Sequence, residues 1–200
     1  MRRSSGARRG RSLRWRRRDE RRAFPNAQFE SNTNERSPSM VTIRPKTVVT
    51  MKVEARCPSH ARTDVRVRDV STTIDEPAER GGTNTGPTPT ETLMASLLGC
   101  TNVITHKVAH KNGVHIDAMS LRLEAQFDRR GVTLQEEVNV PFPEVTLYID
   151  LTTSADQAAV DKVKQELNMF CPVSKVFRGC GTKVNEVWTV RRPAASATAH

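Results

Sequence analysis

Four cysteines are the residues of this 200-residue chain with the widest choice of chemistry, and they stand at Cys57, Cys100, Cys171 and Cys180. Zinc sites are commonly built on closely spaced pairs such as C-x-x-C. The nearest pair here, Cys171 and Cys180, is nine positions apart, so no such motif is present. Inert buried thiols, a mixed metal site, a disulfide framework and a redox pair are the alternatives to weigh.

A mixed metal site would combine Cys100 with His106 and His110, which have the i, i+4 spacing of a ligand pair on a helix. No glutamate completes an H-E-x-x-H pattern, and two solvent-facing histidines near a helix end explain the same spacing. A disulfide framework is typical of shorter, exported chains, and no export signal is evident here. We therefore expect no metal, no cofactor and no structural disulfide.

Redox chemistry depends on the surroundings of Cys100 and Cys171. Cys171 directly precedes Pro172, which suits the first position of a helix, so free N–H groups and the helix dipole would favour its thiolate, with Lys175 adding positive charge. Cys100 lies in an apolar segment, where desolvation alone would raise its pKa and leave it inert unless an arginine lies nearby. The residues alone leave two inert cysteines and a reactive pair equally open.

The positive charge of the chain is concentrated at its N-terminal end. Residues 1–22 hold eleven arginines against two acidic residues, or +9 of the total +10. Such a segment cannot bury itself, so we expect residues 1–39 to be a basic, disordered extension. It could be a nucleic-acid or membrane-surface arm, a mitochondrial targeting segment, or an upstream extension before a true start at Met40 or Met51. Only Trp15 and Phe24 could stack on bases, which disfavours nucleic acid as a partner.

Patterning predicts the first half of the folded domain. β-Branched residues predict one or two strands over 41–55 and a half-buried strand over 62–74. A long loop at 75–91, rich in glycine and proline, leads into a helix over about 90–112, capped by Thr88 or Thr90. This helix is apolar nearly all round, so we expect burial on most sides and a close neighbour at Gly99.

Two alternating strands follow at 118–128 and 143–153, then a helix over about 154–170 capped by Ser154. A short helix begins at Cys171, and the last strand spans 182–192. Strands that come in hairpins rather than in βαβ units predict an α+β fold with antiparallel sheet. The predicted domain spans 40–192, with a tail at 193–200. No run of about 18 apolar residues is present, so no membrane partner is expected.

The combination of two motifs resembles the OsmC/Ohr family of osmotically induced and organic-hydroperoxide-resistance proteins. One is the segment GGTNTGPTPTETLMASLLGC, ending at Cys100, and the other is CPVSKVF, beginning at Cys171. The resemblance covers roughly 41–190, and the loop before the first helix looks like the broad OsmC-like branch. It implies an intertwined homodimer of α+β subunits, with long helices at its centre and sheets built from both chains.

The resemblance also implies a mechanism. Cys100 would be the peroxidatic thiolate that attacks an organic hydroperoxide and becomes a sulfenic acid, and Cys171 the thiol that closes a disulfide with it. An arginine would hold the thiolate and a glutamate would orient that arginine. Glu91 fits the glutamate, and Arg62 fits best among the arginines of the first hairpin, which are Arg56, Arg62, Arg66 and Arg68.

The predicted activity is therefore a thiol-dependent organic hydroperoxide reductase, reduced in turn by a dithiol such as a lipoylated or thioredoxin-like protein. A cytoplasmic location is expected, or a mitochondrial one if residues 1–22 are a targeting segment. The alternative from a different class is a non-catalytic OsmC-like protein that binds a small apolar ligand or senses redox state. Cys57 and Cys180 do not match family positions, and Cys57 is either incidental or could form a mixed disulfide.

Overall fold

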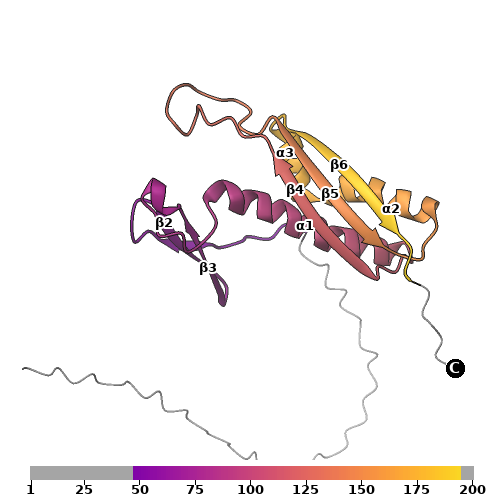
Figure 1. The fold of residues 1–200 in the computed structure, drawn as a ribbon. Helices are drawn as coiled ribbons and strands as arrows, with labels where there is room; N and C mark the ends of the chain where they lie inside the picture. The colour runs from indigo at the N-terminus through magenta and orange to yellow at the C-terminus, as the bar shows by residue number, and fades with distance from the viewer. Residues whose placement is uncertain (1–46, 195–200) are drawn as a thin grey trace, which may run out of the picture. The chain divides into compact units, whose positions relative to one another are not determined.

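The computed structural model describes residues 47–194, so the basic extension at 1–39 and the first part of the strands predicted over 41–55 lie outside the described residues. In the remaining part of that range, the prediction is wrong for 47–53, because a strand begins only at Glu54. The chain divides after Val49, and the helices and strands described here belong to the unit that begins at Thr50. They form two three-stranded sheets and three α-helices, which confirms the α+β class (Figure 1).

The first sheet is an antiparallel meander of β1 (Glu54–Arg56), β2 (Arg62–Val67) and β3 (Val70–Asp75). The prediction of a single strand over 62–74 is wrong, because the chain reverses after Val67, which pairs directly with Val70. Arg68 takes a left-handed conformation with φ of 58° in that turn. The alternation of Val65, Val67 and Val70 resembled one strand because a two-residue turn barely interrupts it.

The loop after β3 is held by Asp75, a fully buried carboxylate. One of its oxygens accepts hydrogen bonds from the backbone N–H and the hydroxyl of both Thr83 and Thr85. A Cβ at Gly82 or Gly86 would lie 1.7 or 2.1 Å from a backbone carbonyl oxygen, so only glycine fits there. This predicted irregular segment contains one short turn of 3₁₀ helix, η1 (Ala78–Arg80).

Helix α1 (Pro89–Lys111) starts where the sequence predicted. The hydroxyl of Thr88 accepts from the Glu91 N–H while the Glu91 carboxylate accepts from the Thr88 N–H, with proline in the first turn. The prediction that α1 is buried on most sides is not met within the described residues. A Cβ at Gly99 would meet no atom of the described residues within 4 Å, apart from its own helix backbone, and Leu93 and Val103 are exposed.

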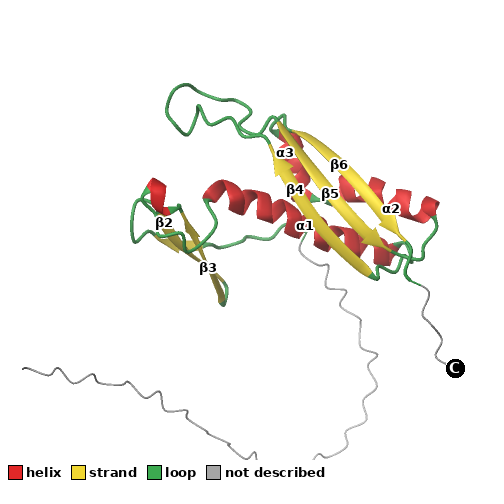
Figure 2. Cartoon of the chain, viewed as in Figure 1, coloured by secondary structure: helices red, strands yellow, loops and turns green. Residues whose placement is uncertain are grey.

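The second sheet has the order β4-β5-β6, formed by β4 (Ala118–Ala125), β5 (Glu144–Thr152) and β6 (Lys183–Arg191). β4 and β5 pair antiparallel, but β5 and β6 pair parallel, so the prediction of an entirely antiparallel sheet is wrong. The two helices between β5 and β6 return the chain to the same end of the sheet, as a parallel connection requires. Helices cover one face of this sheet (Figure 2).

The central strand supplies much of the core, with Val145, Leu147, Ile149 and Leu151 at most 1% exposed. Helix α2 (Gln157–Phe170) is capped by Asp156, which accepts from the Ala159 N–H, and not by Ser154 as predicted. Helix α3 (Pro172–Gly179) follows after the single residue Cys171. None of the helices in the described part of the chain is long and apolar enough to cross a membrane.

Candidate active site

The fold brings Cys100 and Cys171 together, although 71 positions separate them in the sequence. Their sulfur atoms are 3.2 Å apart, with both cysteines as free thiols. A disulfide bond measures about 2.05 Å, so a shift of roughly 1 Å would join them. Cys100 projects from α1, whereas Cys171 sits at the junction of α2 and α3, so contact between these helices positions the pair.

Cys171 is fully buried, and burial controls its acidity. The first turn of α3 does direct the N–H groups of Ser174 and Val173 at the sulfur, which favours the thiolate. Desolvation outweighs them, and the neighbouring Cys100 thiol adds to it, so the pKa of Cys171 is raised to about 11. The helix N-terminus was expected to lower the pKa of Cys171 and favour its thiolate. That expectation is wrong for the net effect, because the pKa is raised.

Cys100 lies at the edge of the buried face of α1 and is only partly buried. On its buried side it packs against the core cluster that contains Leu97, Cys171 and Phe177. Ser96 and Val103, one turn before and after it, are both exposed. The thiol that the resemblance assigns to peroxide attack is thus the more accessible of the two.

Glu91 lies on the same helix as Cys100 but on its opposite side. Nine residues correspond to two and a half turns, or roughly 13.5 Å along the axis. The Glu91 carboxylate accepts a 2.8 Å hydrogen bond from the Thr88 N–H, and this bond, with help from the Thr88 hydroxyl, holds its pKa below the usual value. The single chain therefore does not bring Glu91 to the thiol pair.

Arg62 lies in the first sheet, paired with its near neighbour Asp64 at 2.9 Å. This hydrogen bond raises the pKa of Arg62 and lowers that of Asp64. Among the residues from 47 to 194, no hydrogen bond or ion pair joins Arg62 to Glu91, Cys100 or Cys171. Of the four site residues predicted from the sequence, one chain assembles only the two thiols.

The remaining candidates stay apart from the pair. Cys57 and Cys180 are exposed, and the Cys57 sulfur is 4.0 Å from the Thr63 hydroxyl. His106 and His110 are both exposed on α1. Within the described residues, no group of three histidine, cysteine or acidic side chains is arranged to hold a metal ion.

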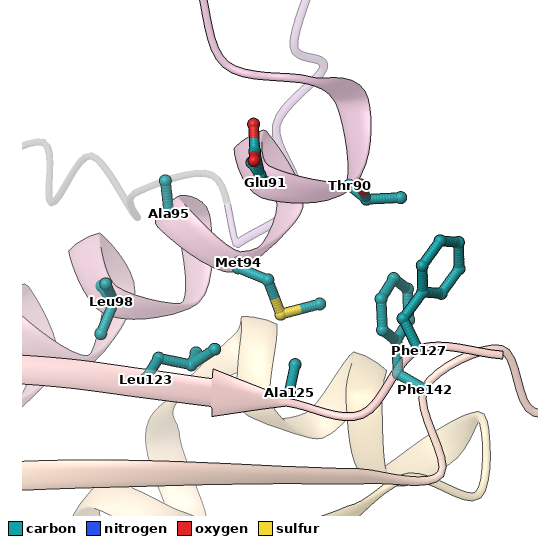
Figure 3. Close-up of a pocket in the computed structure, with 9 residues that line it drawn as sticks. All are labelled: Thr90, Glu91, Met94, Ala95, Leu98, Leu123, Ala125, Phe127 and Phe142. Atoms are coloured by element: carbon teal, nitrogen blue, oxygen red, sulfur yellow. The ribbon is translucent and has the colours of Figure 1, made fainter. Parts of the chain in front are cut away.

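A second feature, which the sequence did not single out as a site, is an apolar cavity of about 420 Å³ between α1 and β4 (Figure 3). Met94 and Leu98 face Leu123 across it, and the rings of Phe127 and Phe142 stack at one end with centroids 4.9 Å apart. Neither cysteine lines it, whereas Glu91 does. The one signal in the sequence was the Pro-Phe-Pro segment around Phe142, which restricts the backbone that presents this ring.

These features define an α+β protein with a vicinal thiol pair at a junction of two helices. A family model described as OsmC-like protein matches residues 82–187, a range that includes both thiols. The match covers more than half of the chain, and the chain belongs to this family.

Solved structures share the fold at low sequence identity. An OsmC-like protein from Mycoplasma pneumoniae superimposes with a TM-score of 0.60 at 13% identity, over 71% of this chain and 97% of that one. A hypothetical protein from Aquifex aeolicus VF5 gives 0.60 at 16%, over 74% and 100%. An organic hydroperoxide resistance protein from Elizabethkingia anophelis gives 0.52 at 18%, also over 74% and 100%. No curated protein matches the chain.

Proposed function

We propose that this protein is a thiol-dependent peroxidase that reduces organic hydroperoxides through a cycle of Cys100 and Cys171. The observation that carries the proposal is the 3.2 Å separation of the two sulfur atoms. Two cysteines that served only as small apolar packing residues would have no need to place their sulfur atoms in contact. Membership in the OsmC-like family and the partial exposure of Cys100 support the assignment.

In the first step the Cys100 thiolate attacks the distal oxygen of the hydroperoxide. The O–O bond breaks, an alcohol leaves after taking up a proton, and Cys100 becomes a sulfenic acid. In the second step the Cys171 sulfur attacks the Cys100 sulfur, the S–O bond breaks, and water leaves with the proton of the second thiol. An external dithiol then supplies two electrons and two protons to restore both thiols.

The apolar surroundings of the pair favour an organic peroxide over hydrogen peroxide. Leu97 and Phe177 belong to the same core cluster as Cys171, and Cys100 packs against that cluster. An alkyl group gains from burial against such side chains, whereas hydrogen peroxide does not. We place the cycle in the cytoplasm, with a lipoylated or thioredoxin-like protein as the dithiol.

We further propose that a homodimer completes the site, as the family resemblance implies. Gly99 and Val103, on the exposed side of α1 beside Cys100, have no covering element in the described chain. A second copy packed on this side, with the long α1 helices at the centre, could bring its Arg62 to Cys100, with its Glu91 orienting that arginine. Neither residue reaches the thiols within one chain, so we assign both to the partner copy.

Adding cumene hydroperoxide to the reduced protein tests the main proposal. We expect two thiols to be lost per peroxide and mass spectrometry to link Cys100 to Cys171, with the same result in a variant in which Cys57 and Cys180 are serine. Hydrogen peroxide should react more slowly. Free thiols after an excess of alkyl peroxide would refute the proposal. Dihydrolipoamide and thioredoxin, tried in turn, would identify the reductant class.

Mixed dimers test the assignment of Arg62. A C100S chain combined with an R62A chain should keep one intact site of the two, because the C100S chain supplies Arg62 to the other chain's Cys100. The R62A homodimer should be inactive. Equal activity of the mixed dimer and the R62A homodimer would contradict the assignment of this arginine to the partner copy.

The 420 Å³ cavity favours one other function, namely binding of a small apolar ligand without catalysis. The cavity is lined by methionine, leucine and two phenylalanines, and it is separate from the thiols. In that case a C100S variant would consume peroxide as slowly as the unmodified protein, and an apolar fluorescent probe would bind both equally.

A further inference from the structure

Arg178 joins three elements of the fold beside the buried thiol. Its Nε donates to the Ser174 hydroxyl at 3.3 Å, one turn earlier in α3, and a terminal nitrogen donates to the Asn168 side-chain oxygen in α2 at 2.8 Å. The same terminal nitrogen lies 3.6 Å from the Glu186 carboxylate on β6. One planar guanidinium therefore connects α2, α3 and the second sheet.

Glu186 completes this connection, and its side chain is only 10% exposed. One of its oxygens accepts from the Trp188 indole N–H at 3.0 Å and from the Asn168 amide at 3.4 Å. A carboxylate this deeply buried needs such partners, because an unpaired buried charge is strongly unfavourable. The Arg178 side chain is 40% exposed, so this ion pair is half-buried, and we expect it to fix geometry more than it adds stability.

Two of these residues flank Cys171 in the sequence. Asn168 lies three residues before it and Ser174 three residues after it, and the single residue between the helices has an extended conformation with ψ of 105°. The Ser174 N–H also points at the Cys171 sulfur. Fixing Asn168 and Ser174 to one guanidinium therefore fixes the helix junction that carries the thiol.

We propose that Arg178 and Glu186 are positioning residues for disulfide closure, holding the α2–α3 junction so that the Cys171 sulfur can cover the last ~1 Å to Cys100. This inference rests on the proposed peroxidase cycle for its biological role. It concerns the second step alone, because Arg178 and Glu186 bind the junction after α2 and not the helix that carries Cys100.

The test compares R178Q and E186Q with a matched surface control, R191Q. Arg191 also pairs with a carboxylate, that of Asp150 at 3.1 Å, but at the other end of β6. A misplacement of about 1 Å can slow a reaction roughly a hundredfold, so we expect closure to be tenfold to a hundredfold slower in R178Q and E186Q. Formation of the Cys100 sulfenic acid should keep its rate, and R191Q should match the unmodified protein in both steps.

Slow closure leaves the sulfenic acid exposed to further oxidation. Intact-mass analysis after a fixed excess of peroxide should therefore show more Cys100 sulfinic acid in R178Q and E186Q than in the control. R178K should restore closure in part, because lysine can pair with Glu186 but cannot bond Ser174 and Asn168 at the same time. Loss of stability alone would not raise the sulfinic acid while sparing the first step.

A redox titration in glutathione buffers measures the same positioning without any peroxide. The effective concentration of one thiol toward the other should fall at least tenfold in R178Q and E186Q, compared under conditions where circular dichroism shows each variant folded. Unchanged closure and unchanged effective concentration would overturn the inference and leave the peroxidase proposal standing. If the unmodified protein forms the disulfide in glutathione buffers but does not react with alkyl peroxide, the proposed function is refuted. The glutathione titration of R178Q and E186Q would still test the positioning role of Arg178 and Glu186.

Discussion

Replacing Gly99 with leucine would reveal whether the exposed side of α1 is a surface or an interface. Glycine inside a helix is less favourable than alanine by about 0.8–1.0 kcal/mol, and leucine is nearly as good as alanine. A Cβ at this position would meet no other part of the described chain within 4 Å. In an isolated chain, Gly99→Leu should therefore raise the free energy of unfolding by roughly 0.8 kcal/mol.

The expected effect reverses if a second copy packs on this face. Overpacking a close contact costs about 1–3 kcal/mol, and a twofold interface contains the substitution twice. Dimer affinity should then fall by roughly thirtyfold to ten-thousandfold, since each 1.4 kcal/mol corresponds to a factor of ten. We expect this second outcome, because the proposed homodimer needs the glycine for close approach of the two helices.

Sedimentation velocity over a wide range of protein concentration, combined with calorimetry, separates the two cases. Gly179→Leu is the matched control, because Gly179 is another exposed helical glycine whose Cβ, if it had one, would meet nothing within 4 Å. The control should leave association unchanged. A Gly99→Leu protein that associates normally and melts about 2–3 °C higher would refute the packing argument, since 1 kcal/mol shifts Tm by about 2–4 °C at this size.

Three individual residues give further tests. Because the pKa of Cys171 is about 11, disulfide closure should accelerate about tenfold per pH unit between pH 7 and 10, and a flat profile in stopped-flow fluorescence would contradict a thiolate attack from this residue. Donors from Thr83 and Thr85 depress the pKa of Asp75, so its stabilising effect is present above the unfolded-state pKa near 3.8 and is lost as pH falls through the folded-state value. Asp75→Asn should thus flatten the loss of thermal stability between about pH 5 and 2, and an unchanged slope would argue against this linkage. Leu97→Ala should lower the free energy of unfolding by about 2–5 kcal/mol in urea titrations, whereas Leu134→Ala, at 92% exposed, should stay within about 0.5 kcal/mol.

Local sequence patterns were sufficient to predict most helices and strands of the fold. Alternation in β5 and the capping signals before α1 predicted both elements to within a residue or two, because burial on one face and unsatisfied N–H groups are local constraints. The parallel pairing of β6 could not be predicted this way. It depends on where two helices return the chain, which is a property of packing and not of the alternation within a strand.

At the thiol site, too, some features could be predicted from the sequence and others could not. The residue types and the helix start at Pro172 were readable, but the net acidity of Cys171 was not, because it is the difference between opposing effects of similar size. The effect that lowers the pKa, that of the helix N-terminus, could be predicted from the sequence. The effect that raises the pKa depends on burial, which the sequence does not give. Arg178 and Glu186 carried no signal at all, since a charged residue on a short helix or a strand is ordinarily solvated.

The positions of Glu91 and Cys100 around α1 support the proposed homodimer. Glu91 and Cys100 are fixed on opposite sides of one regular helix, so the Glu91 carboxylate of one chain cannot orient an arginine at the Cys100 thiolate of the same chain. In the proposed homodimer, a twofold axis beside Gly99 would remove this conflict, because the residues that one copy directs away from its own thiol would face the thiol of the other. Peroxidase activity should therefore fall in proportion to the dimer fraction in Gly99→Leu, even though that chain keeps both cysteines. Full activity in a monomeric Gly99→Leu protein would show that one chain suffices and that a different cation activates Cys100.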